Sequence, residues 1–172
     1  MAIVLIGYMA SGKSSIGKKI AKKHCIPFVD LDDFIAKKEK LNIPDIFRTK
    51  GEIYFRKIET KYLDELLQRE NDFVLAVGGG TPCYGNNMEI IKKSARSIYL
   101  KASLRTIYNK LSKPKNKKKR PLVSAIAITD LKEFIAKHLF ERRVYYERAD
   151  VTIVIDNKTK KEIVEEISLN TL

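Results

Sequence analysis

Short apolar runs alternate with longer amphipathic segments along almost the whole chain. Continuous apolar runs predict buried strands, and apolar residues three to four positions apart predict helices that cover the strands. The expected strands are Ala2–Ile6, Pro27–Val29, Phe73–Val77, Ser97–Leu100 and Val151–Ile155. The expected helices are Gly12–His24, Asp32–Lys40, Gly51–Glu70, Ser103–Leu111, Thr129–Arg148 (with Thr129 as its N-cap) and Lys160–Ile167, and Ser112–Arg120 is expected to be a loop.

Strands that alternate with helices predict an α/β fold with a mostly parallel central sheet. The 172 residues fit one domain, and neither an internal repeat nor a Pro- or Ser-rich linker divides them. In such sheets the ligand site lies beyond the carboxyl ends of the strands. The residues that follow three expected strands are therefore candidates for function: Gly7, then Asp30 and Asp32, then Gly78, Gly79 and Gly80.

The segment Gly7–Ser14 reads GYMASGKS and matches the phosphate-binding pattern G-x-x-x-x-G-K-[ST] without a gap. It follows an expected strand and opens an expected helix, as the pattern requires. Backbone N–H groups of such a loop point at a phosphate, and the helix N-terminus adds partial positive charge. Lys13 would reach the β- and γ-phosphates, and the Ser14 hydroxyl would bind Mg²⁺. The motif predicts a nucleoside triphosphate but leaves the acceptor open.

Asp30 and Asp32 are the expected acidic partners of this loop. In an extended segment their side chains would point the same way, with Asp33 pointing away. One carboxylate could hold magnesium waters, and the other could accept a proton from an acceptor hydroxyl. The alternative is that these aspartates only favour a helix N-terminus. Asp156 follows the last expected strand and is interpreted as a strand-end or turn residue.

Arg56 and Arg142 are candidates for binding an anionic acceptor. Glu59, three residues after Arg56 on the same helix, could hold its guanidinium in place. An arginine donates two parallel hydrogen bonds to a carboxylate, so two converging arginines would imply an acceptor with a carboxylate or a phosphate. Taken singly, each arginine is more simply explained as part of a solvated helix face.

The chain is strongly basic, with 34 basic and 21 acidic residues and a net charge of +13. Such a balance favours anionic partners, either nucleic acid or phosphorylated small molecules. Lys110–Arg120 holds seven basic residues and no acidic one. The run has no interleaved aromatic residues of the kind that stack on single strands, which favours a charged, mobile lid over a specific nucleic-acid surface.

Composition also bears on compartment and assembly. Hydrophobic residues make up 44% of the chain, and the first apolar run is far shorter than the roughly 20 residues of a membrane span. It lacks the features of a signal peptide, and Cys25 and Cys83 are expected to be ordinary thiols of a reducing compartment. We therefore expect a cytoplasmic protein without a membrane partner, and the net charge of a single compact domain favours a monomer.

Taken together, the motifs resemble those of the shikimate kinases, in the same order and spacing from Ile3 to about Asp156. The matching elements are GYMASGKS, DLD at Asp30–Asp32, IFRTKGEIYFRKIE at Ile46–Glu59, VLAVGGG at Val74–Gly80, RPL at Arg120–Leu122 and RRVYYERAD at Arg142–Asp150. The resemblance implies a three-layer α/β/α P-loop kinase fold with five parallel strands in the order 2-3-1-4-5. It also implies ATP and Mg²⁺, and transfer of the γ-phosphoryl of ATP to the 3-hydroxyl of shikimate.

The resemblance implies a role for each site residue. The catalytic residues would be Lys13, Asp32 and the lid arginine Arg120. ATP would contact the loop, Lys110 and Arg120; Ser14 and Asp30 would serve the metal, and Arg56 and Arg142 would bind the shikimate carboxylate. The ATP-binding set is Gly7, Ala10, Ser11, Gly12, Lys13, Ser14, Ser15, Lys110 and Arg120, and the shikimate-binding set is Asp32, Phe47, Phe55, Arg56, Gly78, Gly79, Gly80, Leu122 and Arg142.

The same resemblance assigns residues 32–70 to acceptor binding and residues 112–123 to the lid. The family often has glycine at the position of Ala10 and an arginine where Lys110 stands, and the approach to the lid is rich in lysine. None of these departures removes a residue that the chemistry requires. A kinase for gluconate or a nucleoside monophosphate, and a nucleic-acid-binding P-loop protein, remain the alternatives.

Overall fold

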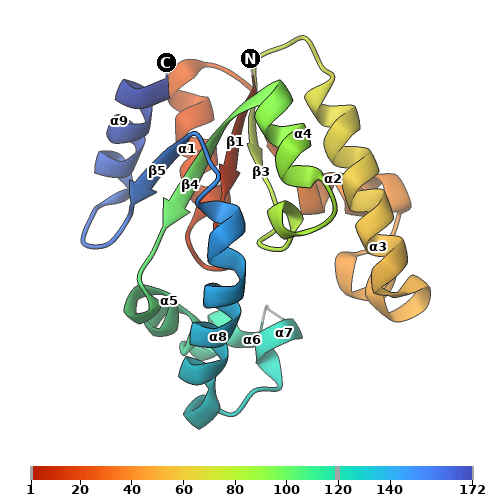
Figure 1. Cartoon of the computed structure of the whole chain (residues 1–172), viewed down its shortest axis with the longest axis vertical. Coiled ribbons are helices and arrows are strands. Elements are labelled where there is room, and N and C mark those ends of the chain that lie inside the picture. Colours follow the sequence, from red (N-terminus) through yellow and green to blue (C-terminus); the bar gives the residue numbers. More distant parts are fainter. Residues whose placement is uncertain (1, 119–120, 172) are drawn as a thin grey trace.

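A computed structural model of the chain describes residues 2–118 and 121–171. Over these residues the chain forms five parallel strands in the order β2-β3-β1-β4-β5 (Figure 1). The strands are β1 (Ala2–Ile6), β2 (Phe28–Asp30), β3 (Val74–Ala76), β4 (Ala95–Lys101) and β5 (Val151–Val154). The expected α/β class and the strand order are confirmed.

Helices cover both faces of the sheet and make three layers (Figure 1). On one face α1 (Lys13–His24) packs against α9 (Lys160–Thr171), and on the other α3 (Ile43–Leu67) packs against α4 (Asn87–Ser94). Because both faces are covered, every residue of the central strand β1 is buried, which explains its uninterrupted apolar sequence. The remaining helices are α2 (Leu31–Glu39), η1 (Thr81–Cys83), α5 (Leu104–Leu111), α6 (Pro114–Lys118), α7 (Pro121–Ser124) and α8 (Ile128–Tyr146).

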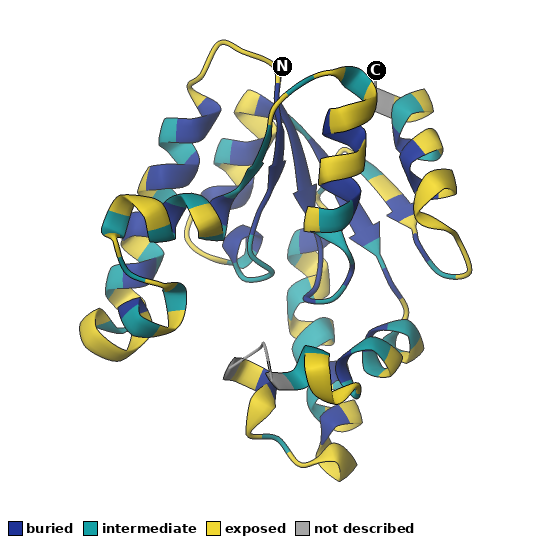
Figure 2. Ribbon diagram, turned by 180° about the vertical axis from the view of Figure 1, so that it is seen from behind, coloured by how far each residue is buried: buried dark blue, intermediate teal, exposed yellow. Residues whose placement is uncertain are grey.

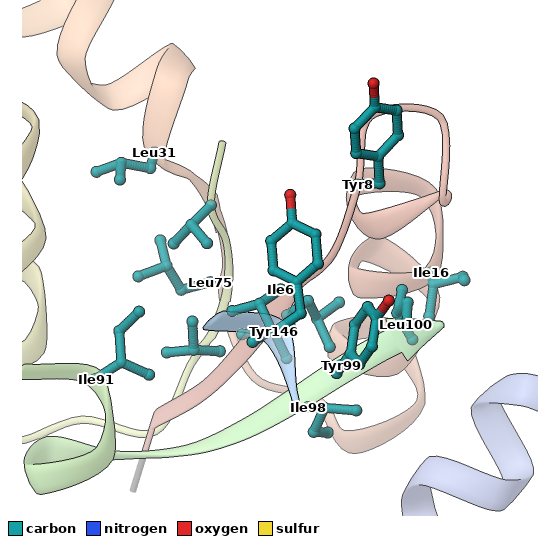
Figure 3. Packing of buried hydrophobic residues seen from close by; sticks show 14 of the residues in the cluster. Ile6, Tyr8, Ile16, Leu31, Leu75, Ile91, Ile98, Tyr99, Leu100 and Tyr146 are labelled. Carbon is teal, nitrogen blue, oxygen red and sulfur yellow. The ribbon is translucent and has the colours of Figure 1, made fainter. Parts of the chain in front are cut away.

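The hydrophobic core lies around the sheet, whereas the lower part of the molecule is mostly exposed or half-buried (Figure 2). Tyr8, Tyr99 and Tyr146 are the largest fully buried side chains. The Tyr146 ring lies beside Ile6 and the Tyr99 ring beside Leu100, whereas Tyr8 lies on the loop that precedes α1 (Figure 3). The Tyr99 and Tyr146 rings are 5.2 Å apart, so α8 is fixed to β4 beside the carboxyl ends of the strands.

Two expectations about local structure were wrong, and one was incomplete. The helix expected from Gly51 is the second part of α3, and a further helical segment that was not expected precedes it from Ile43; the Asn42 side chain caps that segment by accepting from the Asp45 amide, at 2.8 Å. Thr129 is not the N-cap of α8; its hydroxyl donates to Asp130, and Ala127 occupies the cap position. The expected loop 112–120 contains the short helix α6, which begins at Pro114, a residue suited to the first helical turn.

Three further elements, η1, α4 and α7, were not expected from the sequence. No helix among the described residues is both long and apolar enough to cross a membrane.

Candidate active site

A cavity of about 490 Å³ opens beyond the carboxyl ends of β1, β2 and β3. Its lining comes from the loop after β1, the start of α1, the junction of β2 and α2, the turn after β3, and α5, α6 and α9. The predicted site residues in this lining are Ala10, Gly12, Lys13, Ser14, Ser15, Asp30, Asp32, Gly78, Gly79 and Lys110. The fold therefore brings together motifs that are far apart in the sequence.

The loop between β1 and α1 is tightly curved because several of its residues have positive φ values. Gly7 has φ of 143°, and a Cβ there would lie 2.9 Å from the Leu100 carbonyl oxygen, so only glycine fits. Gly12, at φ 98°, caps α1, whose first turn holds no acidic residue. Ala10 also has a positive φ, 63°, a conformation that suits glycine better. The Lys13 ammonium donates to the carbonyl oxygens of Gly7 and Tyr8, at 2.8 and 3.0 Å.

The other two residues predicted in this loop are Ser11 and Ser15. Ser11 is 1% exposed, and its amide donates to the Tyr8 carbonyl oxygen at 3.2 Å. The Ser15 hydroxyl donates to the Gly12 carbonyl oxygen at 3.0 Å. Both serines thus stabilise the curved conformation of the loop through hydrogen bonds within it. Together with the N-terminus of α1 and Lys13, the loop offers N–H groups and positive charge to an anion.

The acidic pair lies beside this loop. Asp30 ends β2 and caps α2, its Oδ1 accepting from the Asp32 amide at 3.1 Å. Its other oxygen accepts from the Ser14 hydroxyl at 2.6 Å. The reason given from sequence for the pairing was wrong, because the segment is not extended: α2 begins at Leu31, and Asp32 belongs to its first turn. Both aspartates nevertheless line the cavity, and Asp33 is exposed.

The electrostatic surroundings of Asp32 differ from those of a surface aspartate. Burial, together with the charges of Asp30 and Glu59, raises the pKa of Asp32 to about 6, although the Lys13 charge lowers it. A carboxylate with such a pKa is mostly ionised at neutral pH and is basic enough to accept a proton. Asp32 therefore has the properties of a general base.

Arg56 is held from three sides. Its Nη1 donates to the Glu59 Oε2 at 2.8 Å, and Glu59, only 1% exposed, also accepts from the Thr81 hydroxyl at 2.7 Å. The guanidinium lies over the Tyr84 ring, 4.2 Å from its centroid. A Cβ on Gly80 would lie 3.0 Å from both terminal nitrogens of Arg56, so the absence of a side chain there leaves room for the guanidinium.

Arg142 approaches the same turn from α8. A Cβ on Gly79 would lie 3.6 Å from the Arg142 Nη1 and 3.4 Å from the Met9 amide nitrogen. The Tyr146 hydroxyl donates to the Gly79 carbonyl oxygen at 2.6 Å and fixes this end of α8 on the turn. On Gly78 a Cβ would lie 3.4 Å from the Asp32 Oδ1. Asp32, Arg142 and Arg56 thus each lie against one of the three consecutive glycines after β3.

The remaining predicted acceptor residues differ in their surroundings. Phe55 is buried, and its ring centroid lies 4.5 Å from that of Phe47, which is 36% exposed. Leu122 is 60% exposed on α7 and is not part of the cavity lining. Arg120 lies outside the described residues, so its expected role stays a prediction from the sequence.

Four residues that were not predicted as site residues also line the cavity: Met9 and Val77, which lie inside the quoted motifs, and Asn116 and Lys160, which do not. Asn116 belongs to α6 and donates to the Lys110 carbonyl oxygen at 2.8 Å. Burial and the nearby Lys160 charge lower the pKa of Lys110. Lys160 begins α9, outside every motif in the sequence, and no local signal distinguishes it from other surface lysines.

Asp156 does not belong to this cavity lining. It follows β5, and its carboxylate accepts from the Ser103 amide, at 3.0 and 3.2 Å, and from the Ser103 and Thr106 hydroxyls at the start of α5. The interpretation as a strand-end residue is confirmed.

Comparisons with known proteins agree with this geometry. The family model described as shikimate kinase matches residues 9–171. A shikimate kinase of Flavobacterium johnsoniae is 48% identical over 166 residues, covering 96% of this chain and 95% of the relative. The structure of a shikimate kinase from Bacteroides thetaiotaomicron has a TM-score of 0.90 at 29% identity, and covers 100% of this chain and 99% of that chain.

A second solved structure carries the acceptor. The shikimate kinase of Acinetobacter baumannii in complex with shikimate has a TM-score of 0.86 at 30% identity, and covers 99% of this chain and 94% of that chain. These findings decide among the acceptors that the motifs had left open. The chain belongs to the shikimate kinase family.

Proposed function

We propose that three groups of residues around this cavity act in phosphoryl transfer: a phosphate-binding loop, an acidic pair and two arginines. The family reaction moves the γ-phosphoryl group of ATP to the 3-hydroxyl of shikimate. The observation that carries the assignment is the convergence on Gly78–Gly80: Asp32, Arg56 and Arg142 approach this turn from α2, α3 and α8, next to the phosphate loop.

The ATP triphosphate would lie on the loop of residues 7–14. Backbone N–H groups of Gly7, Ala10, Ser11 and Gly12 and the N-terminus of α1 would surround its oxygens, and Ser15 supports the loop. Lys13 would exchange its two carbonyl contacts for phosphate oxygens, since a charged acceptor is the stronger partner for an ammonium group. Lys110, at the mouth of the cavity, would contact the nucleotide further out.

A magnesium ion fits the donors present, and we propose that Ser14 and Asp30 hold it, Asp30 through water. The Ser14 hydroxyl and an Asp30 oxygen, 2.6 Å apart, are hard oxygen ligands of the type that Mg²⁺ prefers. No group of three or more His, Cys, Asp or Glu side chains suited to a metal occurs among the described residues, so the ion would also need the phosphate oxygens. When bound, it would neutralise charge on the β- and γ-phosphates.

Asp32 would act on the acceptor hydroxyl, either accepting its proton or orienting it toward the γ-phosphorus. Arg56 and Arg142 would bind the shikimate carboxylate, with Glu59 holding Arg56 in place. Gly78, Gly79 and Gly80 would let the backbone approach the ring of shikimate, and Phe47, Phe55 and Leu122 would form the apolar wall. Alignment of two anionic substrates is the main contribution of such a site, because in water they rarely meet in line.

The domain assignment completes the proposal. Residues 1–172 would form a single P-loop kinase domain, in which residues 32–70 bind the acceptor and residues 112–123 form the lid. Arg120 would stabilise charge on the phosphoryl group during transfer. We further propose that the protein is a cytoplasmic monomer, and that the lysine run serves the lid rather than a specific nucleic acid.

The test is ADP release by the purified protein with ATP and Mg²⁺, with and without shikimate, for the wild type, Asp32→Asn and Asp33→Asn. We expect ADP release that depends on shikimate, and its loss by about 10²-fold or more in Asp32→Asn, a general base typically contributing that much. Asp33→Asn is the matched control, since Asp33 is exposed on the same helical turn. Wild-type turnover in Asp32→Asn would exclude Asp32 from the mechanism. An equal rate of ADP release with and without shikimate would refute the proposed phosphoryl transfer to shikimate.

A further inference from the structure

The long helix α3 is broken where it forms the acceptor side of the site. Gly51 has φ of 81° and ψ of 170°, which no helical residue adopts, so α3 consists of two helical segments, 43–50 and 52–67. The first segment carries Phe47, and the second carries Phe55, Arg56 and Glu59. A Cβ on Gly51 would meet nothing within 4 Å, so glycine is required there by the backbone and not by crowding.

The angle between the two segments must therefore be fixed by contacts outside the backbone. Continuous i to i−4 hydrogen bonds would hold a straight helix, and they are interrupted at the break. On the side of the proposed acceptor pocket the contact is the stacking of Phe47 on Phe55. Phe47 is 36% exposed, and Ile46 is the single buried residue of the first segment, so side-chain packing attaches this segment at few points.

At the contact with α2, one carboxylate joins the two segments. Glu39, the last residue of α2, accepts through Oε2 from the Lys50 ammonium at 3.0 Å and from the Tyr54 hydroxyl at 2.7 Å. Its Oε1 accepts from the Tyr62 hydroxyl at 2.8 Å. Lys50 immediately precedes Gly51, whereas Tyr54 and Tyr62 follow it. The Lys50 ammonium also lies 4.5 Å from the Tyr54 ring centroid, across the break.

This arrangement is unusual for a glutamate at the end of a surface helix. The Glu39 side chain is only 10% exposed, and each of its oxygens has a donor. The hydroxyls of Tyr54 and Tyr62, followed by Lys50, lower the pKa of Glu39 to about 2, so the carboxylate stays ionised throughout the working pH range. The family resemblance gave no role to Glu39, Lys50, Tyr54 or Tyr62.

We propose that Glu39 is a positioning residue for shikimate: by holding Lys50 and Tyr54 across the break at Gly51, it sets the angle of α3 and so places Phe47 against Phe55, whose ring centroid lies 5.2 Å from the Arg56 guanidinium. The inference rests on the proposed role of the second segment in acceptor binding. It predicts an effect on the binding of the acceptor and not of ATP, because Glu39, Lys50, Tyr54 and Tyr62 lie outside the lining of the cavity that contains the phosphate loop.

The experiment compares the wild type with Glu39→Gln, Tyr54→Phe and the control Glu65→Gln. Glu65 pairs with Lys38 at 2.7 Å and also joins α2 to α3, but it is 40% exposed and lies away from the break. For each protein, kcat and the KM for shikimate and for ATP are measured in the coupled assay, shikimate binding is measured by calorimetry, and thermal unfolding is followed by circular dichroism.

We expect Glu39→Gln to raise the KM and Kd for shikimate about fivefold or more, since small displacements of binding groups have large effects on binding and rate. The KM for ATP should stay unchanged, and Tyr54→Phe should act in the same direction but less. Glu65→Gln should leave all of these constants at wild-type values.

Several results would overturn the inference. One is a Glu39→Gln variant that is indistinguishable from Glu65→Gln, and another is an equal rise in the KM for ATP, which would indicate general destabilisation. If Glu39→Gln does not fold, an unchanged shikimate Kd in Tyr54→Phe would overturn it instead. Calorimetry separates the test of Glu39 from the test of the proposed function, because it measures shikimate binding without turnover. If the wild type bound shikimate but released no ADP, the proposed function would be refuted, and the effect of Glu39→Gln on the shikimate Kd could still be measured.

Discussion

Glu59 offers the sharpest test of how the acceptor side is held together. It is 1% exposed and serves two donors at once, Arg56 at 2.8 Å through Oε2 and Thr81 at 2.7 Å through Oε1. Glu59→Gln keeps the size and shape of the side chain but replaces one acceptor oxygen by an NH₂ donor. Either Arg56 or Thr81 must then face a donor, and the negative charge beside the guanidinium is lost.

The size of the effect follows from burial. A hydrogen bond to a charged group contributes about 1.5–3 kcal/mol. Breaking a fully buried ion pair costs about 3–5 kcal/mol, because one charge is left uncompensated. The Arg56 side chain is 15% exposed and keeps a contact of 3.4 Å with Glu52, which moderates the loss. We therefore expect Glu59→Gln to lower the free energy of unfolding by about 2–4 kcal/mol.

The measurement is urea unfolding followed by circular dichroism, together with a thermal scan. For a chain of this size the expected loss corresponds to a fall in Tm of about 5–15 °C. Glu52→Gln is the matched control: Glu52 contacts the same arginine, but at 3.4 Å and with a side chain 54% exposed. Such an exposed pair contributes about 0–1 kcal/mol.

Activity provides the second measurement for the same variants. Because Glu59 orients Arg56, Glu59→Gln should raise the KM for shikimate more than the KM for ATP. The reasoning would be refuted if Glu59→Gln cost less than about 1 kcal/mol, or if it matched Glu52→Gln in both stability and KM. Either result would mean that Arg56 is held by its packing against Tyr84 and Gly80 and not by the buried carboxylate.

Two other predictions concern the catalytic and carboxylate-binding residues. Asp32 must be ionised to accept a proton, and its pKa is raised to about 6, so kcat/KM for shikimate should fall as the pH drops below about 6. Since the Glu59 charge contributes to the raised pKa of Asp32, Glu59→Gln should shift the fall in kcat/KM to lower pH. If the pH at which kcat/KM falls did not change in Glu59→Gln, Asp32 would not be the group that titrates. Arg142→Ala should raise the KM for shikimate about 10- to 100-fold through loss of a charge-assisted hydrogen bond, with little change for ATP. Arg143→Ala is its control, because Arg143 is 55% exposed and pairs with Glu147 at 2.6 Å; equal effects of the two variants, or equal losses for both substrates, would exclude Arg142 from acceptor binding.

The local signals in the sequence were strongest where the chemistry is local. The phosphate loop depends on glycines at fixed spacing, and the positive φ values of Gly7 and Gly12 are the physical reason for that spacing. The buried strand β1 was predicted with its exact ends because covered parallel strands are apolar throughout. The first segment of α3 was missed, because only Asn42 and Pro44 mark its start, whereas Gly51 correctly marked the break before the second segment.

What the sequence by itself determined about this protein is the class of fold, the nucleotide motif and the set of residue types for binding an anionic acceptor. Only the tertiary structure decided which of these residues meet. Asp32, Arg56 and Arg142 come from three helices and converge because parallel strands bring their carboxyl ends to one edge of the sheet. The buried carboxylates Glu39 and Glu59 differ from the many exposed glutamates only in their three-dimensional partners, and such long-range contacts leave no periodicity or motif in the chain.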